Sequence, residues 1–70
     1  MIKFENRTND RFYYLLVEKD LLNHCVLRIY FGGARISRCR VIGFEDQREM
    51  QKEIDRLAKK RLSRGYSLVT

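Results

Sequence analysis

The chain has 70 residues, a single domain's worth of sequence near the lower limit at which a hydrophobic core holds a fold without a partner. Its 44% hydrophobic residues and its lack of proline are typical of a folded domain rather than a disordered tail, and so short a chain excludes a deep active-site cleft. The formal net charge of +6 favours polyanionic partners, with nucleic acid first and an anionic membrane surface second.

The first part of the chain predicts strands. Residues 1–5 carry Ile2 and Phe4 on one face, which predicts a short edge strand, and the polar residues 6–10 predict the turn that ends it. Residues 11–19 (RFYYLLVEK) are rich in aromatic and β-branched side chains with a period of two. This second strand places Phe12, Tyr14 and Leu16 opposite Tyr13, Leu15 and Val17.

Two further strands follow. Asp20 and Asn23 supply turn chemistry, and residues 25–31 (CVLRIYF) alternate again, so that a hairpin is predicted. The Gly32-Gly33 pair interrupts the pattern as a tight turn does. Residues 35–43 then resume it as a third sheet strand that is strongly basic.

The period changes to that of a helix from Glu45 onward. One apolar stripe is formed by Met50, Ile54, Leu57, Ala58 and Leu62. Asp46 is the expected N-cap, with Glu49 completing a reciprocal capping arrangement, and Gly65 is the expected stop. Residues 66–69 are apolar enough to return to the sheet or the core. The expected fold class is α+β: a small antiparallel sheet with one C-terminal helix packed across it, in a single domain spanning residues 1–70.

The sequence offers no catalytic or metal site. Cys25 and Cys39 form no CxxC pair, and His24 is the single histidine, so zinc ligands are too few. We expect a surface histidine, a core cysteine, no cofactor and no enzymatic activity, while a Cys25–Cys39 disulfide stays open. The acidic residues of the helix alternate with basic ones, as solvated pairs do. No signal peptide or membrane span is evident, which predicts a cytoplasmic protein without a membrane partner.

The positive charge is concentrated in the second half of the chain. Residues 1–30 hold five basic and four acidic side chains, residues 31–44 three and none, and residues 45–70 seven and five. A basic stripe of the third strand and the helix end is therefore predicted, beside a stacking surface at Tyr30 or Phe31; its members are Arg35, Arg38, Arg40, Lys59, Lys60, Arg61 and Arg64. The alternative is a basic face that serves only solubility.

From Arg11 onward the chain resembles the WGR domain, a module of DNA-dependent poly(ADP-ribose) polymerases and of many short bacterial proteins. RFYYLLV is similar to that family's opening strand, DLLNHCVLRIY to its hairpin, and FEDQREMQKEIDRLAKKRLSRGYSLV to its C-terminal helix. Where the family has Trp-Gly-Arg, this chain reads Phe31-Gly32-Gly33, and Cys25 stands at the place of the hairpin tryptophan. The chain is thus identified as a divergent member.

The resemblance implies a DNA-binding module in which Phe31 supplies the stacking surface and Gly32 keeps the signature's glycine. Gly33 carries no guanidinium, so Arg28 or Arg35 would take the role of the signature's arginine. The leading hypothesis is a module that binds the phosphate backbone, with DNA a more probable ligand than RNA. The alternative is a protein-interaction module, with a protein partner or a homodimer held by exposed residues such as Leu21 and Leu22.

Overall fold

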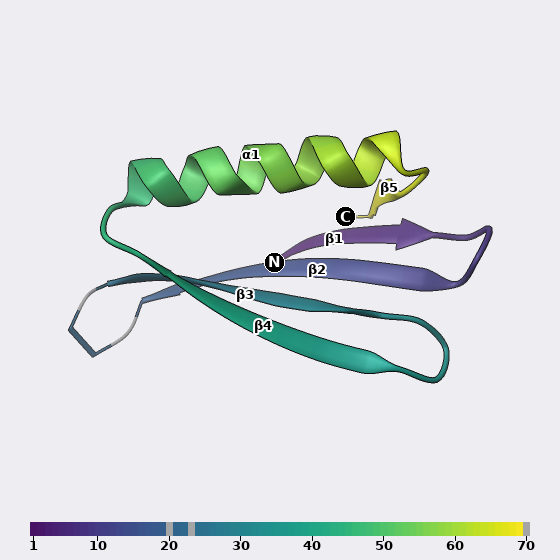
Figure 1. Cartoon of the computed structure of the whole chain (residues 1–70), viewed down its shortest axis with the longest axis horizontal. Helices are drawn as coiled ribbons and strands as arrows, with labels where there is room; N and C mark the ends of the chain where they lie inside the picture. The colour runs from purple at the N-terminus through teal and green to yellow at the C-terminus, as the bar shows by residue number, and fades with distance from the viewer. Residues whose placement is uncertain (20, 23, 70) are drawn as a thin grey trace.

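The computed structural model describes residues 1–19, 21, 22 and 24–69. Within them, strands and helix follow in the order β1 (Ile2–Asn6), β2 (Arg11–Lys19), β3 (Cys25–Gly32), β4 (Ser37–Phe44), α1 (Gln47–Ser63) and β5 (Ser67–Val69) (Figure 1). The predicted α+β class is confirmed. The turn prediction for Asp20 and Asn23 falls on two residues outside the described ones.

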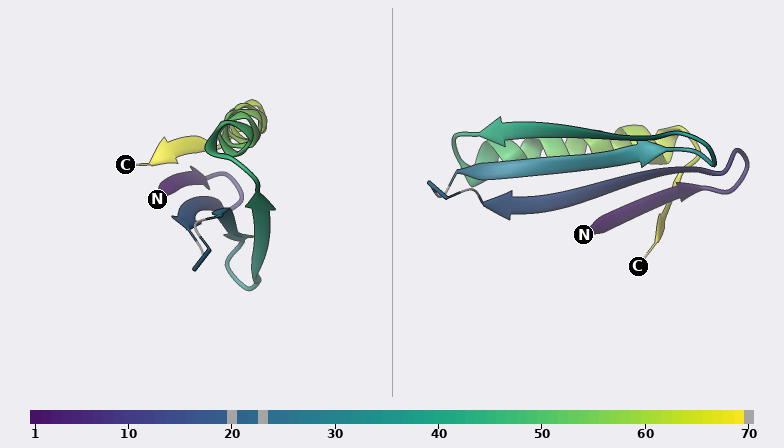
Figure 2. Two further views of the ribbon diagram at one scale, coloured as in Figure 1. Left: turned by 90° about the vertical axis from the view of Figure 1, so that its left-hand side faces the viewer. Right: turned by 90° about the horizontal axis from the view of Figure 1, so that it is seen from below.

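The strands form one antiparallel sheet in the order β4-β3-β2-β1-β5. The first four make a meander, and β5 returns beside β1 after the helix (Figures 1 and 2). The prediction that the N-terminal strand is an edge strand was wrong, because β5 pairs with it through Phe4 and Leu68. Residues 66–69 were expected to return either to the sheet or to the core. The end of this segment joins the sheet as β5, which forms the edge beside β1.

One face of the sheet is covered by α1, as the view from below shows (Figure 2). The alternation predicted for β2 and β3 is confirmed over the middle of both strands: Tyr13 and Leu15 of β2 and Cys25, Leu27 and Ile29 of β3 are buried, and the side chains between them are not. The sheet contributes Phe4, Tyr13, Leu15, Cys25, Leu27 and Ile29 to the core, and the helix contributes Met50, Ile54 and Leu57. No described element covers the opposite face, and we call it the helix-free face.

The ends of α1 are closed by local hydrogen bonds. Asp46 is the N-cap, and its Oδ1 accepts a hydrogen bond from the backbone N–H of Glu49 at 2.8 Å. At the other end Gly65 has a left-handed φ of 89°, which allows the N–H of Tyr66 to reach the carbonyl of Arg61 at 3.0 Å. Both predicted helix boundaries are confirmed, and the second one places Tyr66 directly beside Arg61.

Two other expectations concern single side chains. His24 is exposed and Cys25 is buried, as the alternation predicted. Both cysteines are free, so the disulfide that the sequence left open is not formed. The described residues hold no group of three or more His, Cys, Asp and Glu side chains that could bind a metal ion. None of the described helical residues forms a helix long and apolar enough to cross a membrane.

Candidate functional site

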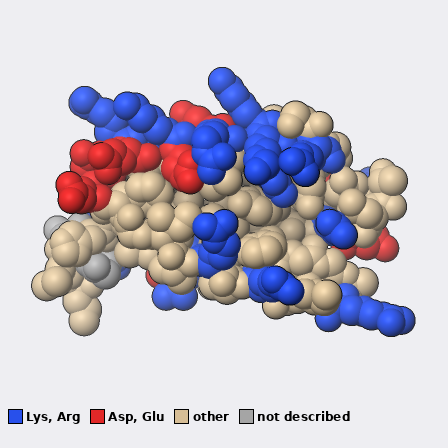
Figure 3. All heavy atoms as spheres, in the orientation of Figure 1, with Lys and Arg blue, Asp and Glu red and all other residues tan. Residues whose placement is uncertain are grey.

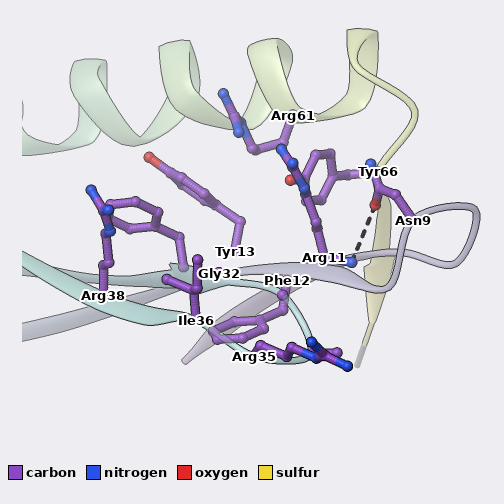
Figure 4. A pocket seen from close by; sticks show the side chains of 13 residues that line it. Asn9, Arg11, Phe12, Tyr13, Gly32, Arg35, Ile36, Arg38, Arg61 and Tyr66 are labelled. Carbon is purple, nitrogen blue, oxygen red and sulfur yellow. Dashed lines mark hydrogen bonds between the residues drawn. The ribbon is translucent and has the colours of Figure 1, made fainter.

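A hollow of the surface lies where the β3–β4 turn meets the C-terminal end of α1. This arginine cavity has a volume of about 580 Å³, and four basic and four aromatic residues line it: Arg11, Arg35, Arg38 and Arg61 with Phe12, Tyr13, Phe31 and Tyr66 (Figure 4). None of the described residues that line it is acidic. Four arginines in the lining of one hollow make it attractive to anions, because their positive potentials add.

Arg61 occupies a helix position whose spacing from the buried apolar residues places it on the core side. It follows Ile54 by seven residues and Leu57 by four, so it lies on the face that α1 turns to the sheet. The sequence assigned this end of the stripe to Leu62, which was wrong, because Leu62 is exposed. With about 100° per residue, the helix places Arg61 rather than Leu62 in line with Ile54 and Leu57. The spacing of Arg61 from these two residues was therefore a sign in the sequence that it faces the sheet.

The Arg61 guanidinium is held between two tyrosine rings. Its central carbon lies 4.4 Å from the ring centroid of Tyr13 and 5.3 Å from that of Tyr66. Its Nε is buried and has no hydrogen-bond partner within the described structure. A buried guanidinium nitrogen without an acceptor is costly, so Arg61 is a donor poised for an anionic ligand.

Tyr13 forms the floor of the cavity beneath Arg61. Burial raises the pKa of its phenol, although the positive charges of Arg61, Arg40 and Arg56 work in the opposite direction. The phenol therefore stays neutral at physiological pH and keeps a proton that it can donate.

Arg38 and Arg40 both point to the helix-covered side of the sheet. The β3–β4 register pairs Phe31 with Arg38 and Ile29 with Arg40, and side chains opposite each other share a face. Both arginines are exposed, because β4 is an edge strand that α1 covers only in part. The predicted third strand begins at Ser37, not at Arg35. Arg35 therefore lies in the turn, beside Phe12 (Figure 4).

Phe31 and Gly32 shape the wall of the cavity. Phe31 is half-buried: its ring lies 6.0 Å from that of Tyr13, and it packs against the core while it lines the hollow. Gly32 ends β3, and a Cβ atom built on it would lie 1.9 Å from the backbone oxygen of Ile36. The N–H of Gly33 donates to that same oxygen at 2.8 Å. The tight turn predicted for the glycine pair is confirmed.

The remaining predicted residues do not meet in the cavity. Arg28 belongs to the helix-free face, where its Nε donates to Glu18 at 3.0 Å. Hydrogen bonding to Glu18 raises the pKa of Arg28. Lys59 lies two positions before Arg61 and therefore on the far side of the helix, whereas Lys60 and Arg64 are exposed on its last turns. Figure 3 shows acidic and basic side chains together over the first half of α1 and basic ones over the second half.

Sequence reasoning missed four of the charged and aromatic members of the cavity: Arg11, Phe12, Tyr13 and Tyr66. Arg11 has the same parity as Tyr13 on β2, which was a usable sign that it faces the helix. Tyr66 is brought in by the left-handed residue that ends the helix.

The comparisons with known proteins found no matching family model, no matching curated protein and no matching solved structure. The chain's own residues therefore have to support any functional assignment.

Proposed function

We propose that this chain is a non-catalytic nucleic-acid-binding module, with DNA as its first candidate ligand, that holds the phosphate backbone at the arginine cavity. The observation that carries the proposal is the convergence of Arg11, Arg35, Arg38 and Arg61 on one hollow without an acidic residue in its lining. Guanidinium groups donate two parallel hydrogen bonds to phosphate oxygens, so a run of phosphates suits this lining.

The aromatic residues of the cavity support the same ligand. Phe31 and Tyr13 present ring surface beside Arg38 and Arg61, and nucleic acids combine phosphates with flat sugar–base units that stack on rings. The buried Nε of Arg61 would gain from a phosphate oxygen the acceptor that it lacks within the described structure. The resemblance to WGR domains, in which Phe31 takes the place of the stacking tryptophan, supports the proposal from a separate direction.

A titration at several salt concentrations tests the proposal. Fluorescent blunt duplex DNA, single-stranded DNA and hairpin RNA are each titrated with the protein, and anisotropy is followed. Four phosphate contacts predict that affinity falls about 100-fold between 50 and 200 mM salt, because each contact releases condensed counterions. Binding that ignores salt, or no binding to any of the three ligands at low salt, would contradict the proposal.

Arg61→Met separates a binding role of this residue from a structural one. Methionine fills a similar volume without a buried unpaired nitrogen, so the free energy of unfolding is expected to stay the same or rise by about 1 kcal/mol. Nucleic-acid affinity is expected to fall about tenfold, since one central phosphate donor is lost. Thermal melting and the anisotropy titration measure the two effects. A less stable protein with unchanged affinity would show that Arg61 serves the fold alone.

A further inference from the structure

Aromatic side chains gather on the helix-free face of the sheet, where no described element covers them. Phe12 and Tyr14 point there from β2, and their ring centroids are 5.0 Å apart. Tyr30 of β3 is paired directly with Tyr14 in the sheet register. All three side chains are half-buried. Water thus remains in contact with ring surface that a folded chain usually packs away, which makes this surface a candidate binding platform.

A second cavity, the aromatic notch, opens beside these rings at the β1–β2 turn. Its volume is about 250 Å³, and Phe12 and Tyr14 form its apolar wall. Its rim is polar, with the carboxylates of Glu5 and Asp10 and the guanidinium of Arg7. Flat apolar walls with donors and acceptors at the edge suit a planar heterocycle.

The notch is joined to the arginine cavity. Phe12 and Arg11 line both hollows, so a single extended ligand can occupy the two at once. Arg35 lies beside Phe12 at the junction (Figure 4). On the other side, the Lys3 ammonium lies 5.4 Å from the ring centroid of Tyr14. The hydroxyl of Tyr14 donates to Glu5 Oε1 at 3.3 Å, so a carboxylate borders the rings as well. A phosphodiester chain would therefore pass on the side of Arg35 and Arg11, and the base would face the carboxylates.

We infer that the aromatic notch binds an unpaired base of a single-stranded nucleic acid whose backbone is held in the arginine cavity. The inference rests on the proposed function and narrows its ligand from nucleic acid in general to strands with free bases. A base stacks on Phe12 and Tyr14, which every base can do, and its amino and ring nitrogen groups meet the carboxylates and Arg7 at the rim. Bases inside a duplex have both faces stacked and their edges paired, so they cannot enter the notch.

The test compares three fluorescent DNAs: a blunt duplex, the same duplex with a short single-stranded extension, and the single strand alone. The variant Tyr14→Leu keeps apolar bulk but removes the flat ring that lines the notch and not the arginine cavity. It is expected to bind the single strand and the extended duplex about tenfold or more weakly, with blunt-duplex affinity within about twofold of the unaltered protein. Equal affinities of the variant and the unaltered protein for all three DNAs would overturn the inference.

Two control variants test whether a loss of binding is specific to the notch. Tyr14→Phe keeps the ring and is expected to retain full binding, which excludes a general loss of structure at this position. Leu16→Ala/Val41→Ala alters the helix-free face outside the notch and is expected to bind all three DNAs normally. Failure of the unaltered protein to bind any of the three DNAs would reject the proposed function itself. If Tyr14→Leu weakens blunt-duplex binding as much as single-strand binding, only the assignment of the notch to unpaired bases would be rejected.

Discussion

Reversing the charge of Arg35 and Arg38 is expected to weaken nucleic-acid binding about 100-fold at moderate salt. Both side chains line the arginine cavity, so the double variant Arg35→Glu/Arg38→Glu removes two phosphate donors and adds two like charges at the same place. The salt dependence should fall as well, by about one unit of slope for each lost contact. Anisotropy titrations at two salt concentrations measure both effects.

The matched control changes the same net charge elsewhere. Lys52 and Lys59 are exposed and lie on the side of α1 that faces away from the sheet. Lys52→Glu/Lys59→Glu is expected to weaken binding by no more than about threefold, since only the long-range field changes. Equal losses in the two double variants would mean that net charge, and not the cavity, attracts the ligand.

Gly32→Ala is expected to destabilise the fold by about 3 kcal/mol and to remove binding at the same time. The added Cβ would lie 1.9 Å from the backbone oxygen of Ile36, so the β3–β4 turn must shift. Domains of this size are stable by only about 4 to 10 kcal/mol, and the loss is therefore a large fraction. The turn also carries Arg35 into the cavity. Urea denaturation measures the free energy of unfolding.

Gly43 provides the control for that substitution. It lies in β4, and a Cβ built on it meets no atom within 4 Å. Gly43→Ala is expected to leave stability unchanged or to raise it by up to about 1 kcal/mol, because alanine reduces the freedom of the unfolded chain. If the two variants melted together, close approach of the turn would not be the reason that a glycine stands at position 32.

The positions of the two cavities determine the path that the proposed ligand would follow across the surface. The arginine cavity lies on the side of the sheet that α1 covers, whereas the rings of Phe12 and Tyr14 belong to the helix-free face. A bound strand would therefore pass around the end of the sheet at Arg11 and Phe12. The exposed Leu21 and Leu22, which the sequence offered as a docking site for a protein, are in β2–β3 connecting residues and line neither hollow.

Local patterns in the sequence determined most of the elements. The period of two in residues 11–19 and 25–31 assigned the buried face of each strand correctly, because alternation is a property of the extended backbone itself. The helix and both of its ends followed from Asp46, Gly65 and the apolar spacing between them. Such signals depend on neighbours within a few residues, so one sequence is enough to interpret them.

Tertiary structure decided which of these residues meet. Only the pairing of β5 with β1 moved the N-terminal strand away from the edge, and it joins residues more than 60 positions apart. The β3–β4 register separated Arg28 from Arg38, because it pairs Arg38 with Phe31, whose side chain lies on the opposite face of β3 from that of Arg28. Long-range packing also brought Arg61, Tyr13 and Tyr66 together from the helix, β2 and the segment before β5. The sequence carried the charge and the rings, but a binding site requires side chains distant in the chain to share one surface, and packing alone settles that.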